Sequence, residues 1–195
     1  NIVMMGMGEP LDNFENSVKF LKLVSDNDGL NIGLRHISLS TSGVADNIYK
    51  LADLNLPITL SISLHASCNE TRSKIMKVNR KWNIQKLLNA CKYYQSITGR
   101  RISFEYALIS GVNDSVTDAD NLCVLLKGIM SHVNLIPVNP VVENNYKRGG
   151  QDSIKKFCDR LNSKGLTATV RRTLGADINA SCGQLRRRKQ QKGED

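Results

Sequence analysis

Two glycines and a carboxylate directly after an apolar run are the first residues in this chain that could do chemistry. The stretch N-I-V-M-M-G-M-G-E-P-L carries four apolar residues (2–5), then Gly6, Gly8 and Glu9. Glycine permits tight turns and close approach of a ligand, and Pro10 stops the strand from continuing. A strand followed by a glycine-rich turn is structural more often than functional, so this motif alone does not define a site.

The same arrangement recurs along the chain. Ser40, Ser63, His65 and Asn139 each stand at or near the C-terminal end of an expected strand. Any one has an ordinary explanation, since serine is common in strands and a lone histidine at a strand end is usually a surface residue. Together with Glu9 they predict a ring of hydroxyls, an amide and a carboxylate that suits ribose hydroxyls and an amino-acid head group. The three histidines lack metal-ligand spacing, and no two carboxylates look like an acid–base pair.

One thiol stands apart from the others. Cys182 lies in the polar stretch D-I-N-A-S-C-G-Q-L, beyond the last expected strand. Such a thiol acts as a nucleophile if its pKa is lowered, and a free surface thiol is the equally weighted alternative. A basic run follows at 186–192, either a solvated tail or, with Arg171 and Arg172, a phosphate-contacting surface.

Composition sets broader limits. The chain has 195 residues, enough for one domain, and a net charge of +9, which suits a polyanionic partner. No run is apolar and long enough to span a membrane, and the five cysteines are scattered, so we expect a reduced, cytoplasmic monomer. Because the chain starts inside an apparent strand and without Met, we interpret it as a piece of a longer protein.

Strand and helix patterns alternate along the chain. Strands are expected over 2–5, 35–41, 57–64, 101–109, 133–138 and 166–173. Helices are expected from Asn13 or Asn16 to near Gly29, and over 44–54, 69–76, 83–97, 117–129 and 152–163. This order predicts a parallel sheet with helices outside it.

The strands are polar on one face. Ile58, Leu60, Ile62 and Leu64 alternate with three hydroxyl residues and His65, and other strands show the same alternation. A doubly wound sheet is apolar on both faces, and a closed barrel is filled with branched apolar side chains. The economical interpretation is a partial (β/α) barrel around a polar, ligand-holding interior. We place this barrel at 1–174 and a C-terminal loop with Cys182 and the basic tail at 175–195.

Five ordered motifs resemble one family of enzymes. The motifs M-M-G-M-G-E-P-L, L-S-T-S-G-V, I-S-L-H-A, N-L-I-P-V-N-P and V-R-R-T-L-G-A-D-I-N-A-S-C-G-Q-L resemble those of the radical S-adenosylmethionine RNA methyltransferases of the RlmN/Cfr group. The resemblance implies a TIM-like radical SAM barrel that methylates adenine C2 in 23S ribosomal RNA and an adenosine in transfer RNA. Pro10 favours C2 over the C8 chemistry of Cfr-like enzymes.

The resemblance also implies roles for individual residues. Gly8 and Glu9 match the motif that holds the methionine amino group of S-adenosylmethionine. Ser40, the triplet Ser63, Leu64 and His65, and Asn139 match the other cofactor-binding positions. Cys182 matches the cysteine that is methylated by one S-adenosylmethionine. A radical from a second molecule then activates that methyl group, which adds to adenine through a transient protein–RNA crosslink.

Part of the family pattern is absent from this sequence. The C-x-x-x-C-x-x-C motif that ligates a 4Fe–4S cluster does not occur, nor does the cysteine that resolves the crosslink. In the family both lie upstream of the G-E-P strand, with the first barrel strand. We therefore expect this chain alone to be inactive and aggregation-prone, with an exposed edge at residues 1–5. A non-catalytic RNA-binding remnant and a C8 methyltransferase remain as alternatives.

Overall fold

Among the residues that the structure describes, six parallel strands form one sheet with the strand order β1-β2-β3-β4-β5-β6. The structure is a computed structural model, and it describes residues 1–6, 8–138 and 146–171. The strands are β1 (Ile2–Met4), β2 (Ile37–Thr41), β3 (Thr59–Ser63), β4 (Ile102–Leu108), β5 (Ser131–Pro137) and β6 (Ala168–Val170). Sequential parallel strands joined by helices are the arrangement of a (β/α) barrel, so the predicted fold class is confirmed.

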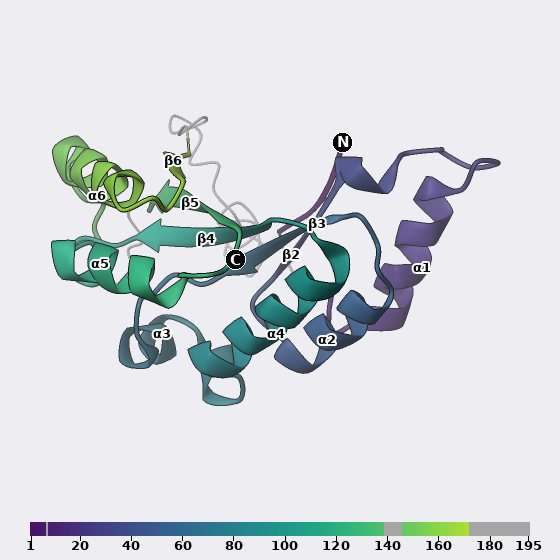
Figure 1. The fold of residues 1–195 in the computed structure, drawn as a ribbon, viewed down its shortest axis with the longest axis horizontal. Helices are drawn as coiled ribbons and strands as arrows, with labels where there is room; N and C mark the ends of the chain where they lie inside the picture. The colour runs from purple at the N-terminus through teal and green to yellow at the C-terminus, as the bar shows by residue number, and fades with distance from the viewer. Residues whose placement is uncertain (7, 139–145, 172–195) are drawn as a thin grey trace, which may run out of the picture.

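Helices cover one side of the curved sheet. They are α1 (Phe14–Ser25), α2 (Ala45–Asp53), α3 (Asn69–Ile75), α4 (Ile84–Thr98), α5 (Val116–Leu125) and α6 (Gln151–Ser163), with 3₁₀ turns η1 (Leu34–His36) and η2 (Lys77–Arg80). Helices α2 and α4 lie below β2 and β3 in Figure 1, α1 lies to the right of these strands, and α5 and α6 lie around the arrowhead of β4. Helix α2 packs on α4, and α5 packs on α6. The sheet therefore has a helix-covered outer face and an inner face.

The outer face is apolar and the inner face polar, as the alternation predicts. Leu60 and Ile62 are completely buried under the helices, whereas Thr59 and Ser63 on the opposite face of β3 are half-buried. Fully burying a Leu or Ile side chain contributes about 1.5–3 kcal/mol. A slip of one residue would exchange the two faces, so this burial fixes the register of β3.

Parallel pairing lines up the inner-face side chains in two rows. One row joins Ser40, Ser61 and Ser103, because Ser40 pairs with Ser61 and Ser61 with Ser103. The second row runs from Ser63 to Glu105, Asn134 and Thr169. Polar side chains that are dispersed in the sequence thus lie in continuous rows across the interior.

Several element boundaries differ from the predicted ones. The expected strand start at Arg35 is a 3₁₀ turn, and α5 ends at Leu125 rather than near Ile129. Asn13 stands at the N-cap of α1 without a side-chain capping bond, since its Oδ1 accepts from Nδ2 of Asn16 at 2.8 Å. These corrections shift the ends of elements and leave their order unchanged.

A buried asparagine joins the ends of β3 and β4. Asn113 is completely buried, and its Nδ2 donates to the carbonyls of His65 (2.8 Å) and Ala107 (2.7 Å). Its Oδ1 accepts from the backbone N–H of Ile109 at 2.7 Å, and its own carbonyl accepts from the Tyr106 hydroxyl at 2.9 Å. The side-chain amide therefore supplies both donors and an acceptor where strand pairing ends.

Asn113→Asp tests this role with almost no change in shape. The new carboxylate oxygen would face the carbonyl oxygens of His65 and Ala107 without a proton to donate. We expect a loss of roughly 2–4 kcal/mol in the free energy of unfolding, measured by urea denaturation at neutral pH. Asn89→Asp on the exposed face of α4 is the matched control, with a change below about 0.5 kcal/mol. Equal effects of the two substitutions would contradict the assigned role.

Candidate active site at the carboxyl ends of the strands

Glu9 is held in place by the next strand's loop. Its Oε2 accepts from the backbone N–H (2.6 Å) and the hydroxyl (2.7 Å) of Ser42, and its Oε1 accepts from the N–H of Leu11 at 3.0 Å. A carboxylate offers about four lone-pair positions, so one position on Oε1 stays available for an ammonium group or another donor. Gly8 precedes it with φ +94°, a conformation that glycine adopts readily. Sequence reasoning identified Glu9 and overlooked Ser42.

Arg72 connects the ends of β2 and β3 through hydrogen bonds from its guanidinium group. The side chain is completely buried and donates to five acceptors. These are the carbonyls of Ser42 (2.7 Å), Ser63 (3.1 Å), Leu64 (3.1 Å) and Trp82 (3.3 Å), and Oδ1 of Asn79 (3.0 Å). Every guanidinium N–H therefore has a partner. Burial lowers the pKa of Arg72 to about 10, so the group remains protonated at neutral pH.

The space around Arg72 is tightly limited. Gly43, next to Ser42, has φ +109°, and a Cβ there would lie 3.1 Å from both Arg72 Nη2 and the Leu87 methyl groups. Arg72 binds the Ser42 carbonyl while Ser42 binds Glu9, so a chain of hydrogen bonds connects Glu9 to Ser63 and Leu64. The predicted residues Glu9, Ser63 and Leu64 are therefore connected to one another through Ser42 and Arg72.

His65 lies just after the end of β3 in a left-handed backbone conformation. Its φ of +57° is uncommon for a non-glycine residue, and its N–H donates to the Glu105 carbonyl at 3.2 Å. Nδ1 accepts from the backbone N–H of Ala107 at 3.0 Å, so the neutral ring carries its proton on Nε2. Burial and the charge of Arg72 lower the pKa of His65 to about 4. Near neutral pH the half-buried ring thus offers an N–H donor rather than a charge.

A buried carboxylate lies in the middle of the inner face. Glu105 is only 5% exposed and accepts from Asn134 Nδ2 at 2.7 Å and from the Ser103 hydroxyl at 3.4 Å. Burial raises the pKa of Glu105, and the bond from Asn134 and the charge of Arg171 oppose that shift. The alternation of β4 had placed Glu105 on the polar face, but no sequence signal separated it from its serine neighbours.

The remaining predicted residues differ in what the structure says of them. Ser40 lies half-buried on the inner face, in the row with Ser61 and Ser103. Asn139 and Cys182 lie outside the described residues. The four described cysteines are free thiols, and burial raises the pKa of Cys91 to about 12 and raises those of Cys123 and Cys158. These three thiols are therefore protonated and poor nucleophiles at neutral pH.

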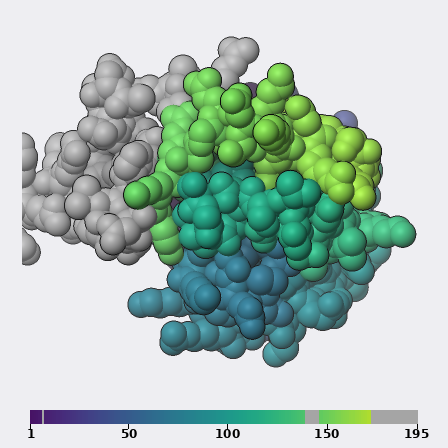
Figure 2. All heavy atoms as spheres, turned by 90° about the vertical axis from the view of Figure 1, so that its left-hand side faces the viewer, coloured from purple at the N-terminus to yellow at the C-terminus, as the bar shows by residue number. Residues whose placement is uncertain are grey.

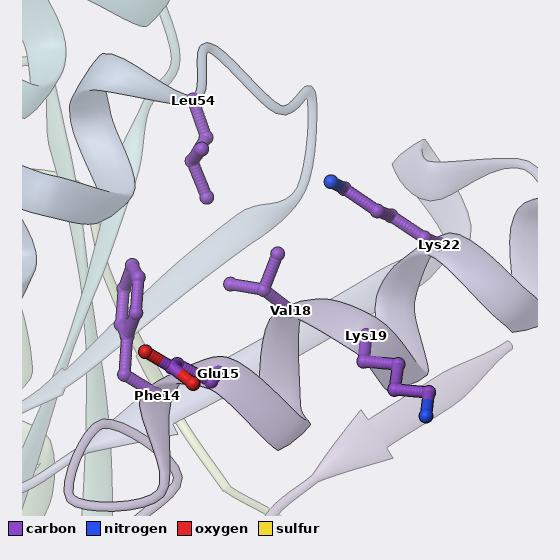
Figure 3. Close-up of a pocket in the computed structure, with 6 residues that line it drawn as sticks. All are labelled: Phe14, Glu15, Val18, Lys19, Lys22 and Leu54. Atoms are coloured by element: carbon purple, nitrogen blue, oxygen red, sulfur yellow. The ribbon is translucent and has the colours of Figure 1, made fainter.

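Two other features lie away from these residues. A hollow of about 310 Å³ opens between α1 and the end of α2, on the helix-covered side of the sheet (Figure 3), and is lined by Phe14, Glu15, Val18, Lys19, Lys22 and Leu54. Within the described ranges, no group of three His, Cys, Asp or Glu residues could hold a metal ion. No helix among the described residues is long and apolar enough to cross a membrane.

Polar side chains at the carboxyl ends of parallel strands in an open barrel define a ligand-binding α/β-barrel domain. Residues 1–123 match the family model of the Radical SAM superfamily, and the chain belongs to that superfamily. It is 53% identical to the "Probable dual-specificity RNA methyltransferase RlmN" of Clostridium novyi and 56% identical to that of Alkaliphilus oremlandii. These matches cover 96% of this chain and 54–55% of the relatives, so the chain spans about half their length.

Solved structures agree with this assignment. A radical SAM methyltransferase from Sphaerobacter thermophilus is 44% identical, with a TM-score of 0.91 over 94% of this chain and 54% of that one. A domain of pyruvate-formate lyase-activating enzyme from Bacteroides vulgatus shares the fold at a TM-score of 0.67 and 16% identity, covering 87% of this chain and 98% of that domain. The predicted barrel type and the resemblance to the RlmN group are both confirmed.

Replacing Arg72 with Met tests the buried fastening. The change leaves four backbone carbonyls and the Asn79 amide oxygen without their donor, so we expect a loss of about 3–5 kcal/mol in unfolding free energy. Arg72→Lys should recover only part of it, because an ammonium group has three donors for five acceptors. The comparison is Arg160→Met, which breaks the partly exposed pair with Asp120 (2.8 Å) and should cost at most about 1 kcal/mol. A mild effect of Arg72→Met would refute the role.

The lowered pKa of His65 predicts a pH dependence of stability. The unfolded ring has its ordinary pKa of 6.5 and the folded ring about 4, so the unfolded state binds the proton first as pH falls. Stability from this group is complete above pH 6.5 and declines toward pH 4. His65→Asn keeps an acceptor and tolerates a left-handed backbone without titrating. As the pH falls from 6.5 to 4, the unfolding free energy of the wild type should decrease relative to that of His65→Asn. Parallel curves of unfolding free energy against pH for the two proteins would contradict the assignment.

Proposed function

We propose that this chain is the barrel portion of a radical SAM enzyme that methylates adenine C2 in 23S ribosomal RNA and in transfer RNA. The similarity to proteins named dual-specificity RNA methyltransferase RlmN, at 53–56% identity over 96% of the chain, carries the proposal. The net charge of +9 supports a nucleic-acid substrate. The G-E-P form of the first motif favours C2 over C8.

The strand-end residues suit S-adenosylmethionine. Glu9 has a free acceptor position for the methionine ammonium group, and Gly8 permits close approach. Ser40, Ser63, Leu64, His65 and Asn139 would complete the binding site. S-adenosylmethionine supplies the methyl group and, on cleavage, the radical that activates it. The chain's own contribution is to hold its head group with a rigid carboxylate and neutral donors.

The iron–sulfur cluster of this family does not fit the residues of this chain. Its five cysteines have no C-x-x-x-C-x-x-C spacing. We therefore propose that the cluster ligands come from elsewhere in the full-length protein.

Cys182 is the proposed methyl carrier, in a C-terminal segment at 175–195 that follows a barrel domain at 1–174. Its support is the motif around it and the protonated state of Cys91, Cys123 and Cys158. The scattered cysteines favour a reducing compartment, and we propose that the protein acts in the cytoplasm as a monomer.

Cys182→Ala tests both the activity and the carrier. In the full-length protein reconstituted with iron and sulfide, we expect wild type to methylate adenine at C2, located by mass spectrometry of digested RNA. Cys182→Ala should lose methylation entirely, while Cys158→Ala should keep it. Methylation at C8 would select the Cfr-like alternative. RNA binding without methylation would select the non-catalytic alternative, and active Cys182→Ala would refute the carrier role.

A further inference from the structure

Four cations project from the segment that follows β3. Residues 69–82 comprise α3, η2 and the turn into α4, and they contain four exposed basic side chains, which we call the basic rim: Lys74, Lys77, Arg80 and Lys81. Glu70 is the one carboxylate of this segment. Among the described residues, both ion pairs use Asp120. The basic rim is therefore not neutralised by a neighbouring carboxylate in this part of the chain.

The segment is anchored from inside. Arg72 binds the strand ends, and Asn79, 4% exposed, accepts from Arg72 and donates to the Asn69 carbonyl (3.2 Å) and the Ser73 hydroxyl (2.7 Å). Asn69 in turn accepts from the N–H of Ile84 at the start of α4, at 2.9 Å. A segment anchored this way presents its outward side chains at fixed positions relative to the barrel.

The basic rim adjoins the candidate site. Residue 69 follows His65 by four positions, and α3 lies at the end of the sheet toward which the arrowhead of β4 points (Figure 1). Figure 2 looks onto that end, and the blue surface, which by the colour bar includes residues 69–82, forms the lower edge of the molecule in this view. A ligand that reaches the strand ends from this side passes the segment.

We infer that the basic rim binds the phosphodiester backbone of the RNA whose base enters the strand-end site. Lysine and arginine side chains are the residues that contact nucleic-acid phosphates, and binding releases the counterions of those phosphates. The Lys81 ammonium lies 4.2 Å from the centre of the Trp82 ring, and the ring steadies this cation. This inference rests on the proposed RNA substrate and adds the surface that receives it.

The test removes the four charges together. Lys74, Lys77, Arg80 and Lys81 are changed to Gln in the full-length protein, and binding to a short RNA hairpin with an unpaired adenosine is followed by fluorescence anisotropy across a salt series. Each phosphate contact contributes about 0.7–0.9 to the slope of log affinity against log salt, so we expect the slope to fall by about 3. The KM for RNA should rise, with kcat nearly unchanged.

A matched variant controls for net charge. Lys19, Lys22, Lys50 and Lys92 are exposed on α1, α2 and α4, on the outer side of the sheet, and their change to Gln removes the same charge. This variant should change the slope by less than about 1. A third variant, with Lys74, Lys77 and Lys81 changed to Arg, should bind like wild type, which separates charge from folding.

The outcomes are distinguishable. If wild type binds and methylates RNA while the basic-rim and control variants weaken binding equally, the surface is refuted and the proposed function stands. If the Arg variant also loses binding, charge is not the cause, and the inference is refuted. A wild-type protein that neither binds nor methylates RNA would overturn both.

Discussion

The buried guanidinium of Arg72 is the interaction on which the candidate site depends. Where parallel strands end, ladder hydrogen bonds end too, and buried carbonyls need donors from elsewhere. Arg72 supplies five, to Ser42, Ser63, Leu64, Trp82 and Asn79. No carboxylate accepts from it, so its charge is spread over neutral dipoles. Burial and, to a smaller extent, the positive charge of Arg72 lower the pKa of His65.

A polar interior demands this kind of support. An unsatisfied buried polar group costs about 1–3 kcal/mol, which a marginally stable domain tolerates only a few times. Asn113 plays the same part between β3 and β4 as Arg72 between β2 and β3. Among the described residues, one buried side-chain atom, Ser131 Oγ, has no hydrogen-bond partner. Near-complete pairing lets the inner face stay polar for a ligand.

The sheet could be predicted from the sequence because burial of one face makes apolar and polar residues alternate along each strand. Sequence reasoning singled out Glu9, Ser63 and His65 as candidates because these residues lie at or shortly after the carboxyl ends of strands β1 and β3. Arg72 and Asn113 were beyond its reach: an arginine in a short polar helix and an asparagine in a Gly-Val-Asn-Asp turn both have the pattern of exposed residues. Each also binds a residue far away in the sequence: Arg72 donates to the carbonyl of Ser42, 30 residues away, and Asn113 to that of His65, 48 residues away. A strand end can be predicted from the local sequence, but the distant residue that binds its carbonyls cannot.

The segment at 69–82 carries both buried side chains that support the strand ends and exposed side chains that face solvent. Arg72 and Asn79 are buried: Arg72 donates to carbonyls at the strand ends, and Asn79 accepts from Arg72. Lys74, Lys77 and Lys81 belong to the same segment and are exposed. The segment thus carries positive charge both on the buried Arg72, which binds carbonyls, and on the exposed lysines, which face solvent. Because Arg72 fixes the position of the segment, a substitution of an exposed lysine changes the electrostatic field at the surface without moving the strand ends. A substitution of Arg72 alters both the field and the strand ends.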